Sequence, residues 1–233
     1  MTKTVAVIPA RGGSKRIPRK NIKPFAGRPM LSYAVAAAFG SRFFDVVAVS
    51  SDDDEILAMA RSLGAVALRR PAELADDFTP TVPVVAHAVR ALEPDHGRLD
   101  PVCCIYPAVP LLRPDEIVEA RALLDASGAP YAFPVVEFPS AVQRALRREG
   151  DGSLTPFFPE FTQTRTQDLA AAYYDAGQFY WGRRDAWLSS LSIHGNGRGL
   201  VIPHWRAVDL DTPDDWRRAE LLRQLLATAG EDA

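Results

Sequence analysis

Residues 5–21 read VAVIPARGGSKRIPRKN, in which a short apolar run leads directly into a loop rich in glycine and cations. The run at 5–8 is typical of a buried strand. Gly12 and Gly13 allow the backbone that follows to approach a ligand closely, and the five Lys and Arg side chains of the loop can bind a polyphosphate. Because an α/β fold binds its ligands where a strand ends, we predict a phosphate-binding loop rather than a solvated basic segment.

This loop differs from two common phosphate-binding motifs. A P-loop requires Gly-Lys-Ser/Thr at the opening of a helix, and the dinucleotide fingerprint requires a third glycine. Pro18 and Pro24 indicate an extended segment instead. Pro29 suits the first turn of a helix that we predict to run to residue 39.

The composition indicates a globular protein whose positive charge is local. The chain has 233 residues, 47% of them hydrophobic, and a formal net charge of −2, which points away from nucleic acid and toward a small anionic ligand. No apolar run approaches the roughly 20 residues that span a bilayer, so we expect no membrane partner. The N-terminus lacks a secretory pattern. Cys103 and Cys104 have neither disulfide nor metal-ligand spacing, so we expect buried thiols and a cytoplasmic location.

Strand-like and helical segments alternate along most of the chain. Apolar runs predict strands at residues 5–8, 46–50, 65–68, 101–106, 131–136, 177–181 and 200–202. Helical patterns lie at residues 29–39, 51–63, 81–92, 114–124 and 184–188, and from residue 212 onward. This alternation predicts an α/β fold with a doubly wound, mostly parallel sheet, formed by residues 1–233 as a single domain.

The alternation weakens between about residues 138 and 173, where prolines and glycines are frequent. Short alternating segments there predict a small β-rich, hairpin-like excursion from the main sheet. The pattern fits a dimerisation arm or a surface flap. Arg165 lies within the excursion, where it either binds an anionic group of a substrate or forms a salt bridge.

Two aspartates form a second candidate site. On a strand, Asp209 and Asp211 would point to one face and Leu210 to the other. Neighbouring carboxylates repel each other unless a cation lies between them, and Mg²⁺ held by carboxylates and substrate phosphates meets that need. The alternative is that Asp209 lies on the surface and Asp211 merely precedes a helix cap at Thr212. The basic loop in the same domain favours the metal site.

The other polar candidates carry weaker signals. Arg70 follows a predicted strand, where it can bind a base, a phosphate or a carboxylate, or form a salt bridge. The acidic run at 52–54 is better explained by the positive end of a helix than by a metal. Ser14 lacks the partners and setting of a serine hydrolase nucleophile. The four histidines are scattered without ligand spacing.

The motif IPARGGSKRIPRKN at residues 8–21 resembles the signature of the cytidylyltransferases that activate sialic acids with CTP. RRPAELA at 69–75 and DLDT at 209–212 occur where that family has them, so the resemblance covers nearly the whole chain. AELADDFT at 72–79 and DAGQFYWG at 175–182 resemble the branch that acts on pseudaminic acid.

Two segments depart from the family pattern. YPAVP at 106–110 stands where ordinary sialic acid enzymes have Gln-Pro-Thr-Ser-Pro, and DAG at 175–177 replaces an Asn-Gly pair. Tyr106 fits the pseudaminic acid branch, whereas Pro107 and Val109 differ from it. These motifs therefore do not decide which sugar acid is the substrate.

The resemblance implies a Rossmann-like nucleotidyltransferase fold of the GT-A type, with Mg²⁺ as cofactor and CTP and a sugar acid as substrates. The implied nucleotide-binding residues are Ala10, Arg11, Gly12, Gly13, Ser14, Lys20, Asn21 and Arg70. The implied sugar-binding residues are Tyr106, Arg165, Gln178 and Tyr180. Asp209 and Asp211 would hold the metal, and Arg11, Lys20 and Asp211 would be catalytic. The resemblance also implies a homodimer in which Arg165 reaches the sugar carboxylate in the neighbouring subunit.

These observations together predict nucleotidyl transfer. The anomeric hydroxyl of a nine-carbon 2-keto sugar acid, first of all pseudaminic acid, would attack the α-phosphate of CTP and release pyrophosphate. The alternatives are the same chemistry on N-acetylneuraminic, legionaminic or 3-deoxy-octulosonic acid, a nucleotide-sugar glycosyltransferase, and a non-catalytic CTP-binding protein. Whether Asp211 acts as a base or only as a metal ligand is not decided by the sequence.

Overall fold

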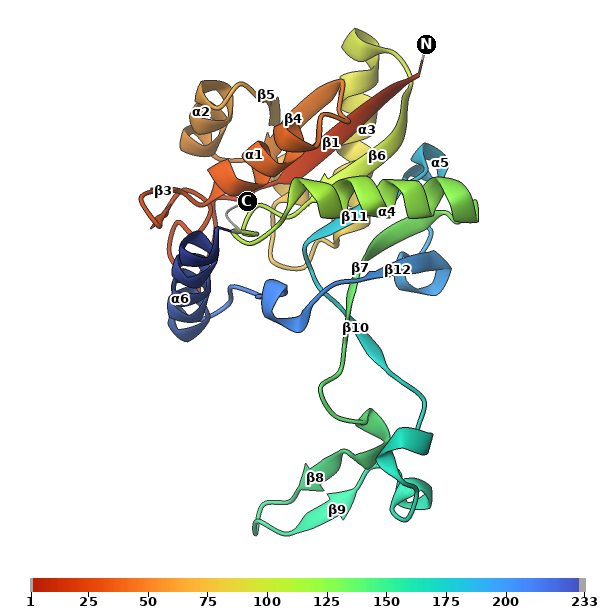
Figure 1. Ribbon diagram of the computed structural model, residues 1–233. Helices are drawn as coiled ribbons and strands as arrows, with labels where there is room; N and C mark the ends of the chain where they lie inside the picture. The colour runs from red at the N-terminus through yellow and green to blue at the C-terminus, as the bar shows by residue number, and fades with distance from the viewer. Residues whose placement is uncertain (1, 231–233) are drawn as a thin grey trace.

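The computed structural model describes residues 2–230 and is built around an eight-stranded sheet (Figure 1). The strands are β1 (Lys3–Pro9), β4 (Val46–Ser51), β5 (Val66–Arg69), β6 (Leu99–Ile105), β7 (Tyr131–Glu137), β10 (Tyr173–Asp175), β11 (Phe179–Gly182) and β12 (Gly197–Val201). Their order is β10-β7-β11-β6-β1-β4-β5, with β12 also paired to β7. The neighbours β6, β1, β4 and β5 are parallel, so the predicted α/β fold with a mostly parallel sheet is confirmed.

Two strands of the sheet, β10 and β11, run antiparallel to their neighbours. β11 is inserted antiparallel between β6 and β7. The chain reaches β11 through a tight turn at Gly177, whose φ of +63° lies in the left-handed region. The preceding strand β10 is itself antiparallel to β7.

The helices cover both faces of the sheet. They are α1 (Leu31–Ser41), α2 (Asp54–Ser62), α3 (Thr81–His96), α4 (Pro114–Ser127), α5 (Arg184–Leu188) and α6 (Pro213–Ala229). Buried side chains of α1, α2 and α4 pack with Ala6 and Ile8 of β1, whereas those of α3 and α5 pack with Val5 and Val7. Alternate residues of β1 thus serve opposite faces, which makes the sheet doubly wound. None of the helices within residues 2–230 is both long and apolar enough to cross a membrane.

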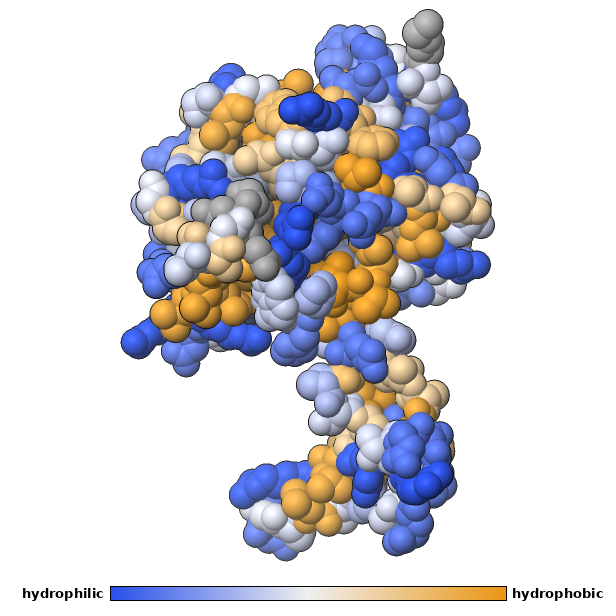
Figure 2. Space-filling view, viewed as in Figure 1, coloured by the Kyte–Doolittle hydropathy of each residue, from blue (hydrophilic) through white to orange (hydrophobic). Residues whose placement is uncertain are grey.

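Residues 138–172 leave the body between β7 and β10, and we call them the arm. The arm contains the hairpin β8 (Leu146–Arg148) and β9 (Leu154–Pro156) and short 3-10 turns. It projects well away from the sheet in Figure 1. Figure 2 shows hydrophobic side chains on its surface, and the exposed large ones are Phe138, Leu146, Leu154, Phe157 and Phe158.

The last helix brings a distant part of the chain to the first loop. Thr212 caps α6 by accepting from the Asp215 N–H, and Pro213 occupies the first turn, as its sequence predicts. Trp216 of α6 packs edge-on against Phe25, which lies in the small β2–β3 hairpin (Pro24–Phe25 and Arg28–Pro29). This packing holds residues 208–211 beside the loop that follows β1.

Candidate active site

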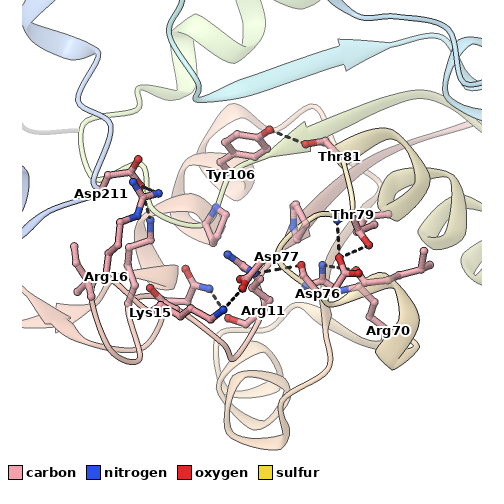
Figure 3. Close-up of a pocket in the computed structure, with 18 of the residues that line it drawn as sticks. Arg11, Lys15, Arg16, Arg70, Asp76, Asp77, Thr79, Thr81, Tyr106 and Asp211 are labelled. Carbon is pink, nitrogen blue, oxygen red and sulfur yellow. Dashed lines mark hydrogen bonds and ion pairs between the residues drawn. The ribbon is translucent and has the colours of Figure 1, made fainter.

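A cavity of about 610 Å³ lies at the carboxyl ends of the parallel strands β1, β5 and β6 (Figure 3). We call it the pocket. Asp76, Asp77 and Thr79 line one side of it (Figure 3). The loop after β1 lines the other side through Pro9, Arg11, Ser14, Lys15, Arg16, Ile17, Lys20 and Asn21, whereas Ala10, Gly12 and Gly13 do not line it. Asp209 and Asp211 reach the pocket from the segment before α6. Parallel strands end at one edge of a sheet, which explains why segments so distant in sequence meet here.

The loop after β1 is anchored through its backbone. The Ala10 N–H donates to Ser50 O at 2.9 Å, and the Asn21 side chain donates to Arg11 O at 2.9 Å. The Gly12 N–H donates to Asp52 at 3.1 Å. A Cβ on Gly12 would lie 2.6 Å from an Asp53 carboxylate oxygen, so this approach to α2 requires glycine.

Asp53 also explains the acidic run that precedes α2. Its side chain accepts from the Glu55 and Ile56 N–H groups as the helix N-cap, as the sequence predicts. The same carboxylate pairs with Arg19, which also contacts Glu55. Arg19 is therefore directed to α2 and does not line the pocket, unlike Arg11, Lys15, Arg16 and Lys20. Our prediction that all five cations of the loop serve a polyphosphate was wrong for Arg19.

Lys20 faces the two aspartates. Its Nζ donates to Leu210 O at 2.8 Å and lies 3.8 Å from Asp211 Oδ1. Burial lowers the pKa of Lys20, and the nearby carboxylates oppose that shift. Arg16 pairs with Asp211 at 2.7 Å. Positive charge is thus concentrated where Asp209 and Asp211 enter the pocket.

Asp209 and Asp211 share one side of the chain, as predicted, but not on a strand. Residues 208–211 have no regular secondary structure and belong to no strand of the sheet. Leu210 points the other way, 1% exposed, into the core cluster around Trp216. That packing, rather than sheet pairing, orients the carboxylates.

The carboxylate pair suits a divalent cation. Burial raises the pKa of Asp209, and the charge of Asp211 raises it further, while Lys20 and Arg16 oppose the shift. Oxygen donors of this type, completed by substrate phosphates, fit Mg²⁺. Within residues 2–230, no three His, Cys, Asp or Glu side chains cluster as a metal site.

The acidic segment opposite the loop was missed as part of the site. Asp77 forms ion pairs with Arg11 and Lys15, and Arg11 also donates to the Asp76 backbone (Figure 3). These pairs lower the pKa of Asp77. The sequence AELADDFT at residues 72–79 could have indicated this part of the site, because it places two acidic residues shortly after Arg70.

Arg70 is deeply placed in the pocket. It is 5% exposed, and its guanidinium donates to Ser50 O at 3.1 Å and to Leu74 O at 3.4 Å. Burial lowers its pKa. Its Nε has no hydrogen-bond partner among the described residues, which leaves a buried donor available to a ligand.

Of the four candidate sugar-binding residues, Tyr106 lines the pocket and the other three do not. Tyr106 lines the pocket, and its hydroxyl lies 2.7 Å from Thr81 Oγ1 (Figure 3). Tyr180 lies behind it, with ring centroids 5.4 Å apart. Gln178 does not line the pocket, because it is 3% exposed and donates to Arg206 O at 2.8 Å. Arg165 lies on the arm, where it pairs with Asp168, and does not line the pocket of its own chain.

A basic loop at the end of the first strand, facing two carboxylates across a nucleotide-sized pocket, is the arrangement of an α/β enzyme that handles phosphate groups. A family model described as Cytidylyltransferase matches residues 5–188. The chain belongs to this cytidylyltransferase family and is thus a nucleotidyltransferase.

Two relatives and one solved structure illustrate the similarity. A pseudaminic acid cytidylyltransferase of Campylobacter jejuni is 38% identical over 94% of this chain and 96% of the relative. An N-acylneuraminate cytidylyltransferase B of Danio rerio is 35% identical over 92% of this chain, which spans 50% of that relative. CMP:2-keto-3-deoxy-manno-octonic acid synthetase complexed with CTP shares the fold, with a TM-score of 0.71 at 20% identity over 98% of this chain and all of that one.

Proposed function

We propose that this protein transfers CMP from CTP to a nine-carbon 2-keto sugar acid, pseudaminic acid, and releases pyrophosphate. The observation that carries the proposal is the pocket itself, in which Arg16 and Lys20 lie against Asp211, and Asp209 lines the same cavity. The substrate class is supported by the relatives named above, whose printed names include pseudaminic acid and N-acylneuraminate. Two buried, unpaired cysteines fit a reducing compartment, which supports a cytoplasmic location.

The chain's own residues supply charge and position. Arg11 and Lys20 would bind the triphosphate, with Ser14 and Asn21 holding the loop against it. Negative charge grows on phosphate oxygens during the transfer, and fixed cations stabilise it without reorganising. Mg²⁺ held by Asp209 and Asp211 would neutralise further charge on the phosphates. Arg70 and its unpaired Nε would face the cytosine end.

We also propose a homodimer in which each arm completes the site of the other subunit. The arm exposes Leu146, Leu154, Phe157 and Phe158 to solvent in the single chain, more apolar surface than so thin a segment can bury by itself. Arg165 lies outside its own pocket, and a partner's pocket would give its guanidinium a sugar carboxylate to bind.

The proposal is tested by measuring pyrophosphate release from CTP, ATP, GTP and UTP, each with pseudaminic, legionaminic, N-acetylneuraminic and 3-deoxy-octulosonic acid. We expect CTP with pseudaminic acid to have the highest kcat/KM. A preference for another acid would replace the sugar and retain the chemistry. CTP binding without pyrophosphate release for any acid would support a non-catalytic CTP-binding protein. Consumption of a nucleotide sugar instead would support a glycosyltransferase.

A further inference from the structure

A chain of side chains connects the pocket to the root of the arm. It begins at Tyr106 in the pocket wall, whose ring meets Tyr180 edge-on. The Tyr180 hydroxyl donates to Asp175 Oδ2 at 2.8 Å. Asp175 is the last residue of β10, the strand on which the arm returns to the sheet. The pocket wall and the arm are therefore linked through two rings and one carboxylate.

Asp175 gathers three hydrogen-bond donors. Besides the Tyr180 hydroxyl, Oδ2 lies 2.7 Å from His194 Nε2, and Oδ1 accepts from the Gly177 N–H at 2.8 Å. A carboxylate accepts and does not donate, so Tyr180 and His194 both present a proton to it. The side chain is 22% exposed, and it holds three elements together: the end of β10, the turn before β11, and the segment after α5.

Aromatic packing follows the same route. The Phe133 ring lies 5.7 Å from that of Tyr180 and 5.6 Å from that of His194. Burial raises the pKa of Tyr106 and of Tyr180, so both hydroxyls stay protonated and able to donate. Tyr180 is 4% exposed, and a buried hydroxyl without an acceptor costs more than a normal hydrogen bond contributes. Asp175 thus fixes the position of the Tyr180 hydroxyl, and the Tyr180 ring in turn packs against the Tyr106 ring, whose own hydroxyl lies beside Thr81 Oγ1.

We propose that Asp175, assisted by His194, is a positioning residue that holds Tyr180 and Tyr106 as the sugar-side wall of the pocket, and so sets the affinity for the sugar acid but not for CTP. This inference rests on the proposed function, because it assumes that the sugar occupies the Tyr106 end. At the nucleotide end, Lys20 donates to Leu210 O and Arg70 donates to Ser50 O and Leu74 O, so these side chains are held by partners other than Asp175.

The test compares Asp175→Asn, Tyr180→Phe and the double variant. Asparagine has the shape of aspartate but offers a single acceptor oxygen to three donors, so at least one donor faces an amide NH₂ group. We expect each single variant to raise the KM for the sugar acid about tenfold or more, with the KM for CTP within about twofold of wild type. Both changes break the same hydrogen bond. The KM of the double variant for the sugar acid should therefore exceed that of the more impaired single variant by no more than about twofold. His194→Gln should show a smaller rise, because His194 is not in contact with Tyr106.

The matched control is Asp185→Asn, which removes a carboxylate that is 74% exposed on α5. Its kinetic constants should equal those of wild type, and calorimetric CTP binding should be equal in all variants. A sugar KM within twofold of wild type in both Asp175→Asn and Tyr180→Phe overturns the inference. Equal rises in both KM values overturn it too, because they indicate a general structural role. Wild-type protein that releases no pyrophosphate with any sugar acid refutes the proposed function instead.

Discussion

Replacing Lys20 by methionine removes one charge from the pocket and keeps nearly the same volume. The Lys20 side chain is 22% exposed, and its Nζ lies 3.8 Å from Asp211 Oδ1. At that separation, and with an effective dielectric constant of about 20, one unit charge interacts with another by about 4 kcal/mol. A triphosphate bound beside Lys20 would experience an attraction of the same order.

Only the part of this interaction that grows in the transition state affects turnover. Removal of one preorganised donor to a developing oxyanion typically costs about 3 kcal/mol. We therefore expect Lys20→Met to lower kcat by about 10²–10³-fold, with a smaller rise in the KM for CTP. Loss of the hydrogen bond to Leu210 O should reduce the free energy of unfolding by only about 1 kcal/mol.

The assay is steady-state pyrophosphate release at saturating sugar acid, with melting temperature as a check on folding. Lys23→Met is the matched control, because Lys23 lies over the Trp216 ring at 4.6 Å and does not line the pocket. Lys23→Met should retain kcat within about twofold, since surface substitutions away from a site have small effects. A kcat for Lys20→Met within a few-fold of wild type would show that Lys20 does not stabilise the transition state.

Two further predictions concern assembly and stability. A mixture of Arg165→Ala and Asp211→Ala proteins, each inactive alone, should regain about a quarter of wild-type activity, because half of randomly mixed dimers carry one intact site; no recovery after confirmed subunit exchange would contradict a shared site. Arg184 donates twice to Glu93, at 2.6 and 2.8 Å, and so lowers the pKa of Glu93. The stabilisation is therefore complete above the ordinary pKa of glutamate and is lost as the pH falls through the lower folded value. In urea unfolding at pH 7, Glu93→Gln should be less stable than wild type by about 2 kcal/mol, and this deficit should shrink as the pH falls through the folded pKa of Glu93. A deficit that stays the same as the pH is lowered would contradict this prediction.

Local sequence patterns were sufficient to predict the parallel strands, the loop after β1 and the start of α6. The apolar run at residues 5–8 and the loop after it depend on neighbouring residues, and so does the cap formed by Thr212 and Pro213. The parallel strands could be read from continuous apolar runs because both faces of the sheet are covered by helices. Each of these features depends on residues that are close together in the sequence.

Features that depend on distant contacts could not be predicted in the same way. Arg19 and Lys20 are adjacent cations of the same loop, and nothing in the sequence distinguishes their roles. In the structure, Arg19 pairs with Asp53 at the start of α2 and therefore does not line the pocket. The Asp209 and Asp211 carboxylates point into the pocket because Leu210 packs beside Trp216, not because of a strand. The hydrogen bonds of Asp175 join segments up to 19 residues apart, and no spacing rule relates them.

If the protein joins the α-phosphate of CTP to a sugar acid, phosphorus NMR of a single reaction with the protein, CTP, Mg²⁺ and pseudaminic acid will detect both products. We expect equal growth of a phosphodiester resonance coupled to the sugar and of a pyrophosphate resonance, as CTP disappears. Appearance of CDP with inorganic phosphate, or of no new phosphodiester, would contradict it.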